Sequence, residues 1–304
     1  MVSASVAWGG VLFGLLVFWG GLAGLRSGLH GLAGDSLHRV VRKWGRRPWL
    51  AVVTGILVTA LVQSSSAVSV IVVSLTEAGI VPLPAAALLV LGANLGTTVT
   101  GQIAAWRPLL FSPLLFLLAM VSMLGGKRGR LCAYCCGGLG LVFVGLELMV
   151  VFASATPAAG LLHGGANFYS GLAAGTVVTG ILQSSSAVTG LAMGLAAGGV
   201  IPMLGAAGMV LGSNIGTCVT ALLAASGRGR EARRLAIFHL MFNILGVALA
   251  IPWVRQLLWL CGWYILGPER CLANLQTFFN LATVVMGIAF LKPLLTLVRW
   301  LVPR

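Results

Sequence analysis

The chain has 304 residues, of which 59% are hydrophobic and only 8% are charged, and its mean hydropathy is +1.05. A soluble globular protein of this length needs more surface charge, so the composition indicates a membrane protein with several spans. The net charge of +14 does not indicate nucleic-acid binding, because Lys and Arg form short clusters between apolar runs. These clusters, at 39–47, 127–130 and 228–234, predict cytoplasmic loops.

The first apolar run, about residues 5–25, predicts a membrane span that enters from the exterior. No basic residue precedes this run, which argues against a cleaved signal peptide. A basic amphipathic segment follows at about 27–47 and is expected to lie on the cytoplasmic surface. The N-terminus is therefore predicted to be exterior.

The chain then contains two copies of one segment, related by a constant offset of 120 residues. The sequence QSSSAV at 63–68 recurs letter for letter at 183–188, and GANLGTTVT at 92–100 recurs with substitutions as GSNIGTCVT at 212–220. No insertion separates the matched parts within a copy. A duplication of this extent predicts two copies of one structural unit.

Each serine motif is predicted to lie in a re-entrant helical hairpin, at about 49–80 and 169–199. If residues 49–75 crossed the membrane completely, the later spans would place the Lys127 cluster outside, against the positive-inside rule. Three spans separate the hairpins, so the two repeats are expected to have inverted topology, as in many secondary transporters. The alternative is that the serines are ordinary helix-packing residues bonded to their own carbonyls.

The fold class expected is an all-α polytopic membrane protein in three parts. Residues 1–126 form the first repeat, with the first span, the surface helix, the hairpin 49–80, a broken span at 84–105 and a linking span at 109–126. Residues 127–230 form the second, with a span at about 131–153, the hairpin 169–199 and a broken span at 203–225. Residues 231–304 form the C-terminal helices, with spans at about 234–253 and 273–298, an interfacial stretch near 256–266 and a cytoplasmic C-terminus.

A chain break at membrane depth frees amides and carbonyls that protein, ions or cavity water must satisfy. Amides and hydroxyls at the start of a half-helix favour an anion. Serine oxygens and the amide oxygens of Gln63, Gln183, Asn94 and Asn214 suit Na⁺. Neither the hairpins nor their partner spans contain Lys or Arg, so co-bound cations, not a fixed side-chain charge, are expected to neutralise the anion.

Together with the stretches at 32–48 and 230–247, the paired motifs resemble the type II sodium/phosphate cotransporter family. The resemblance covers nearly the whole chain and implies Na⁺-coupled symport of inorganic phosphate, by alternating access, across the cytoplasmic membrane. It implies no cofactor other than Na⁺ as the coupling ion. Enzyme activity is not expected, because histidines and acids are scattered and the serines have no base beside them.

The resemblance also implies that both motifs line the phosphate and Na⁺ sites. The phosphate-binding residues expected are Gln63, Ser64, Ser65, Ser66, Gln183, Ser184, Ser185 and Ser186. The cation-binding residues expected are Gln63, Ser66, Asn94, Thr97, Thr98, Gln183, Ser186, Asn214 and Thr217. Cys218 stands where the first copy has Thr98, which predicts a weaker cation site in one half.

Polar residues outside the motifs are accessory candidates. Glu147 is expected deep in a span, where it is either a candidate proton-coupling group or a carboxyl that is protonated or reaches polar groups of the bundle. His239 with Asn243, and Gln276 with Asn280, share a spacing of four that places each pair on one helix face. They are expected either to join the outer helices or to touch the transport path.

Alternative functions on the same fold are phosphate export, carriage of another oxyanion, and a phosphate-sensing module without turnover. The partners expected are phosphate, Na⁺ and the lipid bilayer, and no nucleic acid. The chain is expected to lack the C-terminal domain, similar to phosphate-uptake regulators, of many bacterial relatives, so a separate regulatory protein is a further possible partner. Gly-rich spans could pack within one chain or between chains, and the oligomeric state is left open.

Overall fold

Every element of the computed structural model is a helix within the residues it describes, which are 3–33, 36–44, 47–106, 109–155, 167–262 and 265–303. Six segments of this described part are long and apolar enough to cross a membrane. They are Ala4–Leu32, Leu83–Ala105, Leu109–Ser154, Met203–Ala225, Arg230–Leu260 and Gly267–Ala289. The predicted all-α, multi-pass membrane fold is confirmed.

The first part of the chain forms five helices: α1 (Ala4–Ala33), α2 (Ser36–Trp44), α3 (Pro48–Val62), α4 (Ser65–Glu77) and α5 (Leu83–Ala105). Helix α1 is longer than expected, since residues 27–33 continue it instead of joining the surface segment. The reason is its packing, because a Cβ on Gly28 would lie 2.6 Å from the carbonyl oxygen of Leu131. The close contact between α1 and the helix that contains Leu131 thus extends past Arg26.

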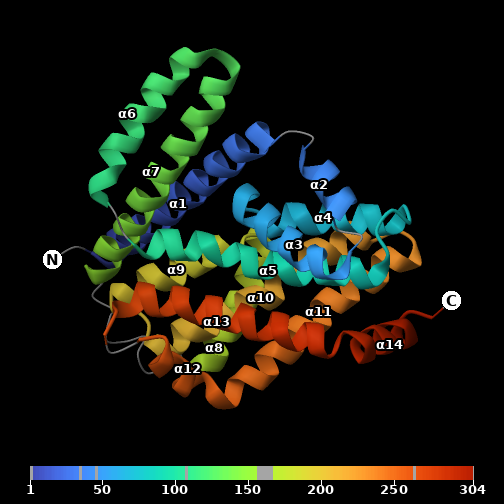
Figure 1. The fold of residues 1–304 in the computed structure, drawn as a ribbon. Helices are drawn as coiled ribbons and strands as arrows, with labels where there is room; N and C mark the ends of the chain where they lie inside the picture. The colour runs from blue at the N-terminus through green and yellow to red at the C-terminus, as the bar shows by residue number, and fades with distance from the viewer. Residues whose placement is uncertain are drawn as a thin grey trace.

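The second part contains α6 (Ser112–Ser122), α7 (Gly126–Ser154), α8 (Phe168–Leu182), α9 (Ser185–Ala197) and α10 (Met203–Ala225). The expected linking span at 109–126 is a short α-helix of 11 residues with a 3₁₀ turn at either end. Figure 1 shows α6 and α7 as an antiparallel pair that rises from the rest of the molecule, with α1 beside α7.

The C-terminal part contains α11 (Arg230–Ala250), a 3₁₀ turn (Ile251–Trp253), α12 (Val254–Leu260), α13 (Gly267–Ala289) and α14 (Leu291–Leu301). The single span expected at 273–298 is wrong, because α13 ends at Ala289 and α14 begins at Leu291. Pro293 explains the break. Its ring would clash with the carbonyl of residue 289 in a continuous helix but is tolerated in a first turn.

The two copies fold alike. Helices α3, α4 and α5 have the bounds of α8, α9 and α10 after a shift of 120 residues. The helix contacts repeat too: a Cβ on Gly92 would lie 2.1 Å from Val52 O, and one on Gly212 would lie 2.1 Å from Leu172 O. With 15 and 13 residues, the paired helices are shorter than the ~20 residues of a full span, which agrees with the re-entrant prediction. Re-entrance and inversion stay predictions, because length does not place a helix in a bilayer.

The spans that carry the Asn-x-Gly-Thr segments are not broken, contrary to expectation. Helices α5 and α10 are continuous through Asn94 and Asn214. The hydroxyl of Thr97 donates to Ala93 O at 3.0 Å, and that of Thr217 donates to Ser213 O at 2.8 Å. These hydroxyls are satisfied by the helix itself, so the polar segment needs no break.

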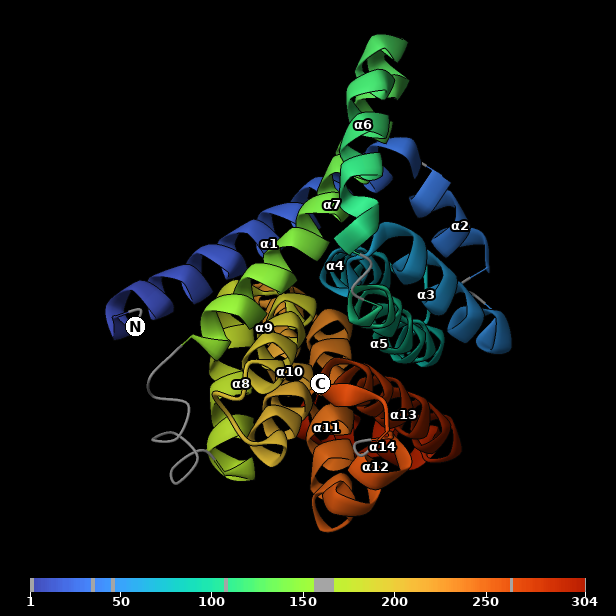
Figure 2. The same cartoon turned by 90° about the vertical axis from the view of Figure 1, so that its left-hand side faces the viewer.

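Helices α1 and α7 lie across both copies, as Figure 2 shows, with α3–α5 on one side and α8–α10 on the other. The C-terminal helices join the copies from the opposite face: α11 packs against α10 and α4, and α13 packs against α5 and α9. This crossed packing brings the two breaks, at Gln63 and Gln183, into one region.

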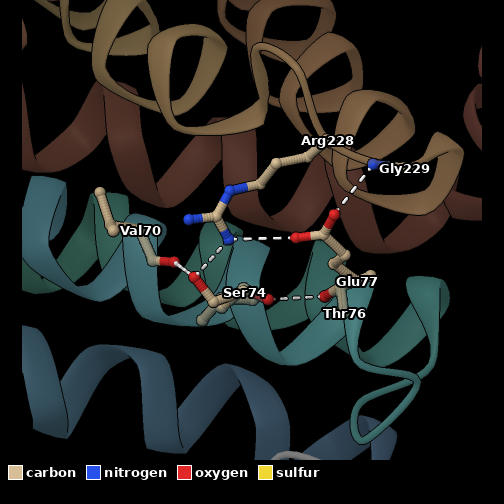
Figure 3. Close-up of polar contacts among 7 residues, drawn as sticks. Val70, Ser74, Thr76, Glu77, Arg228 and Gly229 are labelled. Atoms are coloured by element: carbon tan, nitrogen blue, oxygen red, sulfur yellow. Dashed lines mark hydrogen bonds and ion pairs between the residues drawn. The ribbon is translucent and has the colours of Figure 1, made fainter.

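A charged contact also joins the two halves. At the end of α4, Glu77 Oε2 lies 3.2 Å from Arg228 Nη1, and Glu77 Oε1 accepts a hydrogen bond of 2.9 Å from Gly229 N, at the start of α11 (Figure 3). Ser74 Oγ accepts a bond of 2.8 Å from the same guanidinium. Glu231 pairs with Arg234 at 2.6 Å, as expected, whereas Asp35 lies outside the described residues.

Candidate functional site

Both Gln-Ser-Ser-Ser motifs form the same break between two helices. Gln63 (φ 57°, ψ 28°) ends α3, and Gln183 (φ 51°, ψ 33°) ends α8. Among the described residues, these are the non-glycine residues with positive φ, a conformation that costs energy and often occurs at functional sites. Ser64 and Ser184 then cap the next helices, accepting hydrogen bonds from Ala67 N and Ala187 N at 3.2 and 3.3 Å.

The structure brings the two breaks together. Ser66 Oγ of the first motif donates to Gln183 O of the second at 3.3 Å. Arg26 connects them again, since its Nε donates to Gln63 O at 2.9 Å and its Nη2 donates to Ser184 Oγ at 3.0 Å. The N-termini of α4 and α9 therefore lie close together. Because helix N-termini attract anions, this region favours a negatively charged ligand.

The serines of this region are mostly buried. Ser65, Ser185 and Ser186 are 5%, 7% and 4% exposed, and Ser64 and Ser66 are partly buried. Ser186 Oγ has no hydrogen-bond partner among the described residues. Since buried polar groups are nearly always paired, an unpaired hydroxyl beside two helix N-termini is available to a ligand.

A side-chain cation lies beside the two motifs, although none was expected there from the hairpins and their partner spans. Arg26 belongs to α1, outside the hairpins and their partner helices, and the extension of α1 past residue 25 places its guanidinium between the motifs. Sequence reasoning missed it because it considered only the duplicated segments. The available signal was a lone arginine within an apolar run, which is rare in membrane helices and often functional.

The two glutamines differ in their surroundings. The amide of Gln63 is buried, accepts a hydrogen bond from Thr100 Oγ1 and donates one to Ala60 O. Gln183 is exposed, and Thr220, the counterpart of Thr100, has no partner for its hydroxyl among the described residues. The Gln63 side chain is therefore enclosed, whereas the Gln183 side chain is exposed.

The asparagines show a similar asymmetry. Asn94 Nδ2 donates to Asn243 Oδ1 at 3.1 Å, and Asn243 Nδ2 lies 3.3 Å from Cys218 Sγ. In the other half Asn214 donates to Val210 O of its own helix. Asn280 Oδ1 and Gln276 Oε1 are buried without a partner among the described residues.

The remaining expected residues have varied roles. Thr98 donates to Leu95 O of its own helix. His239 is fully buried, its ring is stacked on Phe242 at 5.5 Å, and neither ring nitrogen has a partner among the described residues. Glu147 is partly buried in α7 and has an interaction partner within the protein.

Several helices of the two copies contain buried hydroxyls without a hydrogen-bond partner among the described residues. In the described part of the chain they include Thr54, Thr59, Ser69, Thr179, Ser186, Thr189 and Thr220. Thr59 and Thr179 are repeat counterparts, and their carbonyls accept bonds of 2.7 Å from Gln63 N and Gln183 N. The sequence analysis assigned them no role. Carbonyl oxygens at the ends of broken helices are known to coordinate Na⁺ in transporters.

A family model described as Na⁺/Pi-cotransporter matches the chain twice, over residues 16–150 and 159–293. An uncharacterised Bacillus subtilis protein, YqeW, is 33% identical over 79% of this chain and 80% of its own length. The Salmonella typhimurium protein YjbB, named a putative inorganic phosphate export protein, is 31% identical over 80% of this chain and 46% of its own length. Rabbit sodium-dependent phosphate transport protein 2A is 41% identical over 28% of this chain and 14% of its own length. No solved structure matches the chain.

Proposed function

The chain belongs to the Na⁺/Pi-cotransporter family, and from this premise we propose that it carries inorganic phosphate across the cytoplasmic membrane together with Na⁺. The observation that carries the proposal is the meeting of the two Gln-Ser-Ser-Ser breaks, joined by Ser66 and Arg26. Alternating access then follows from movement of the hairpins against the other helices, as in transporters built from inverted repeats.

Phosphate is proposed to bind at the N-termini of α4 and α9, to the amides and hydroxyls of the two motifs. Na⁺ is proposed to bind at oxygens near the breaks, including those of Gln183, Asn214 and Thr217 in the second copy. A phosphate oxygen and a Na⁺ that share this buried region each lower the cost of desolvating the other. This mutual stabilisation is the proposed physical cause of coupling between phosphate and Na⁺.

Export is a second candidate for the direction of transport in the cell. The relative YjbB is named a putative phosphate export protein, and this chain spans less than half of its length. A symporter runs in the direction of its summed gradients, so one site serves uptake and export alike. Proteoliposomes preloaded with phosphate and Na⁺ test the outward direction directly.

The test of the proposed function is uptake of labelled phosphate into proteoliposomes with a gradient of Na⁺, K⁺ or protons as the only driving force. We expect uptake with the Na⁺ gradient. Ser66→Ala and Ser186→Ala should raise the phosphate KM by roughly 10- to 150-fold, since a hydrogen bond to a charged group is worth about 1.5–3 kcal/mol.

Ser154→Ala is the matched control, because the Ser154 hydroxyl donates to Val150 O of its own helix. This variant should transport like the unmodified protein. Absence of uptake under every gradient would refute the transport proposal. Uptake that ignores Na⁺ would refute the coupling.

A further inference from the structure

Arg26 is a charged residue inside a candidate membrane span. It lies in α1 (Ala4–Ala33), seven residues before its C-terminal end, which corresponds to about 10 Å along the axis. Arginines in such positions usually extend toward the membrane surface, where water solvates the charge. Here the guanidinium is bonded to the two helix breaks instead. Its position has to be explained by what it contacts.

The Arg26 guanidinium donates hydrogen bonds to both copies. Gln63 O, its partner in the first copy, is the carbonyl of the left-handed residue that ends α3. Ser184 Oγ, its partner in the second, already accepts the capping bond from Ala187 N at the start of α9. The repeat at an offset of 120 residues gives Leu146 as the counterpart of Arg26. Among the described residues, the cation bonded to both breaks thus comes from α1, and α7 has an apolar residue at the same offset.

The electrostatics of the junction, the region where the breaks at Gln63 and Gln183 meet, favour an anion. Helices α4 and α9 begin there, each with 13 residues and each with the positive end of its dipole at the break. A guanidinium adds a full positive charge to these two partial charges. It has five N–H donors, and its bonds to described residues use two, from Nε and Nη2. A separate observation points to the same place: Ser186 Oγ, in the first turn of α9, is buried and has no partner among the described residues.

We propose that Arg26 is the fixed counter-charge of the transported oxyanion and donates hydrogen bonds to two of its oxygens. On binding, one of these oxygens replaces Ser184 Oγ as a partner of the guanidinium. The inference rests on the proposed function and deepens it. A planar guanidinium pairs with two oxygens of a tetrahedral oxyanion in a way that an ammonium does not. Arg26 thus favours a divalent oxyanion such as phosphate, and it neutralises charge that Na⁺ would otherwise have to balance.

The test compares Arg26→Gln, Arg26→Lys and Arg299→Gln with the unmodified protein. Uptake of labelled phosphate in proteoliposomes gives KM, and thermal unfolding in detergent gives the stabilisation by phosphate and by Na⁺ separately. We expect Arg26→Gln to raise the phosphate KM at least tenfold and to abolish stabilisation by phosphate, while stabilisation by Na⁺ alone remains. Arg26→Lys should be intermediate. Arg299 is exposed on α14, and its variant should behave like the unmodified protein.

The outcomes separate the two proposals. If the unmodified protein neither transports phosphate nor is stabilised by it, the proposed function fails. If it transports phosphate and Arg26→Gln has the same phosphate KM, the role of Arg26 is overturned. Should the neutral variant not fold, a folded Arg26→Lys protein with unchanged KM overturns it equally. Equal loss of stabilisation by phosphate and by Na⁺ would assign Arg26 a purely structural role.

Discussion

Asn243 of α11 and Asn280 of α13 each follow a polar residue four positions earlier but have different partners. Asn243 is fully buried on α11 and bonds to Asn94 of α5, while its own amide N–H approaches Cys218 of α10. Asn280 is equally buried on α13, but its Oδ1 has no partner within the described residues. The first side chain therefore joins helices, whereas the second presents a free oxygen.

Replacing each asparagine by alanine should separate these roles. Asn243→Ala leaves Asn94 Nδ2 buried and unpaired, so we expect it to lower the free energy of unfolding by about 1–3 kcal/mol. Asn280→Ala removes an unused acceptor and should change stability less, but it should raise the Na⁺ concentration needed for half-maximal uptake. Thermal unfolding and Na⁺ titration of uptake measure the two effects. Similar stability losses with unchanged Na⁺ dependence would contradict the assignment.

The sequence correctly predicted that the two serine motifs, which lie inside the duplication, would be neighbours. The recurrence at a fixed offset identified both serine motifs, and the structure joins them through Ser66 and Gln183. Arg26 could not be found in that way, because its partners come from tertiary packing of α1 across both copies. The amide pair of Asn94 and Asn243 was missed for the same reason, since 149 residues separate them.

At the scale of elements, the helix before each break packs closely on the long helix of the same copy. A Cβ on Gly55 of α3 would lie 2.2 Å from Leu89 O of α5, and one on Gly175 of α8 would lie 2.2 Å from Met209 O of α10. Backbone carbonyls cannot withdraw as a flexible side chain can. The distance between the helices therefore depends on these glycines, as is common in membrane helix packing.

Gly55→Ala and Gly175→Ala should each push the paired helices apart. Overpacking of this kind costs about 1–3 kcal/mol, so we expect lower unfolding temperatures and reduced phosphate uptake. Gly20→Ala is the control, because a Cβ at Gly20 of α1 meets no atom within 4 Å. Comparison of the three purified proteins by thermal unfolding checks the prediction, and equal stability would show that the contact yields easily.

Element bounds were predictable where the repeat or the hydropathy defined them, and less so elsewhere. The expected bounds of the second matched helix, 203–225, agree with α10. The break at Phe290 was missed because apolar residues continue through it, and hydropathy alone does not register a proline in a first turn. The breaks expected in α5 and α10 were wrong because polar side chains bonded to their own helix do not interrupt it.

At the scale of the whole molecule, the contact between Glu77 and Arg228 joins the first copy to the segment that follows the second. It joins the end of α4 to the start of α11, and the repeat offset gives Ala197 as the counterpart of Glu77. Both side chains are about one-third exposed, so the ion pair is worth roughly 0–1 kcal/mol. A contact of that size biases a conformational equilibrium without locking it.

Glu77→Gln and Arg228→Gln should therefore shift the balance between access states in the same direction. A bias of about 1 kcal/mol corresponds to roughly fivefold in a rate or an apparent affinity, so we expect changes of that order or less in phosphate uptake. The double variant should resemble either single variant, because both remove the same interaction. Glu231→Gln is the control. Glu231 and its partner Arg234 both belong to α11, so their contact does not link two parts that move relative to each other. If the effects of the two single variants add in the double variant, or if Glu231→Gln has the same effect, the contact does not act as a link between the moving parts.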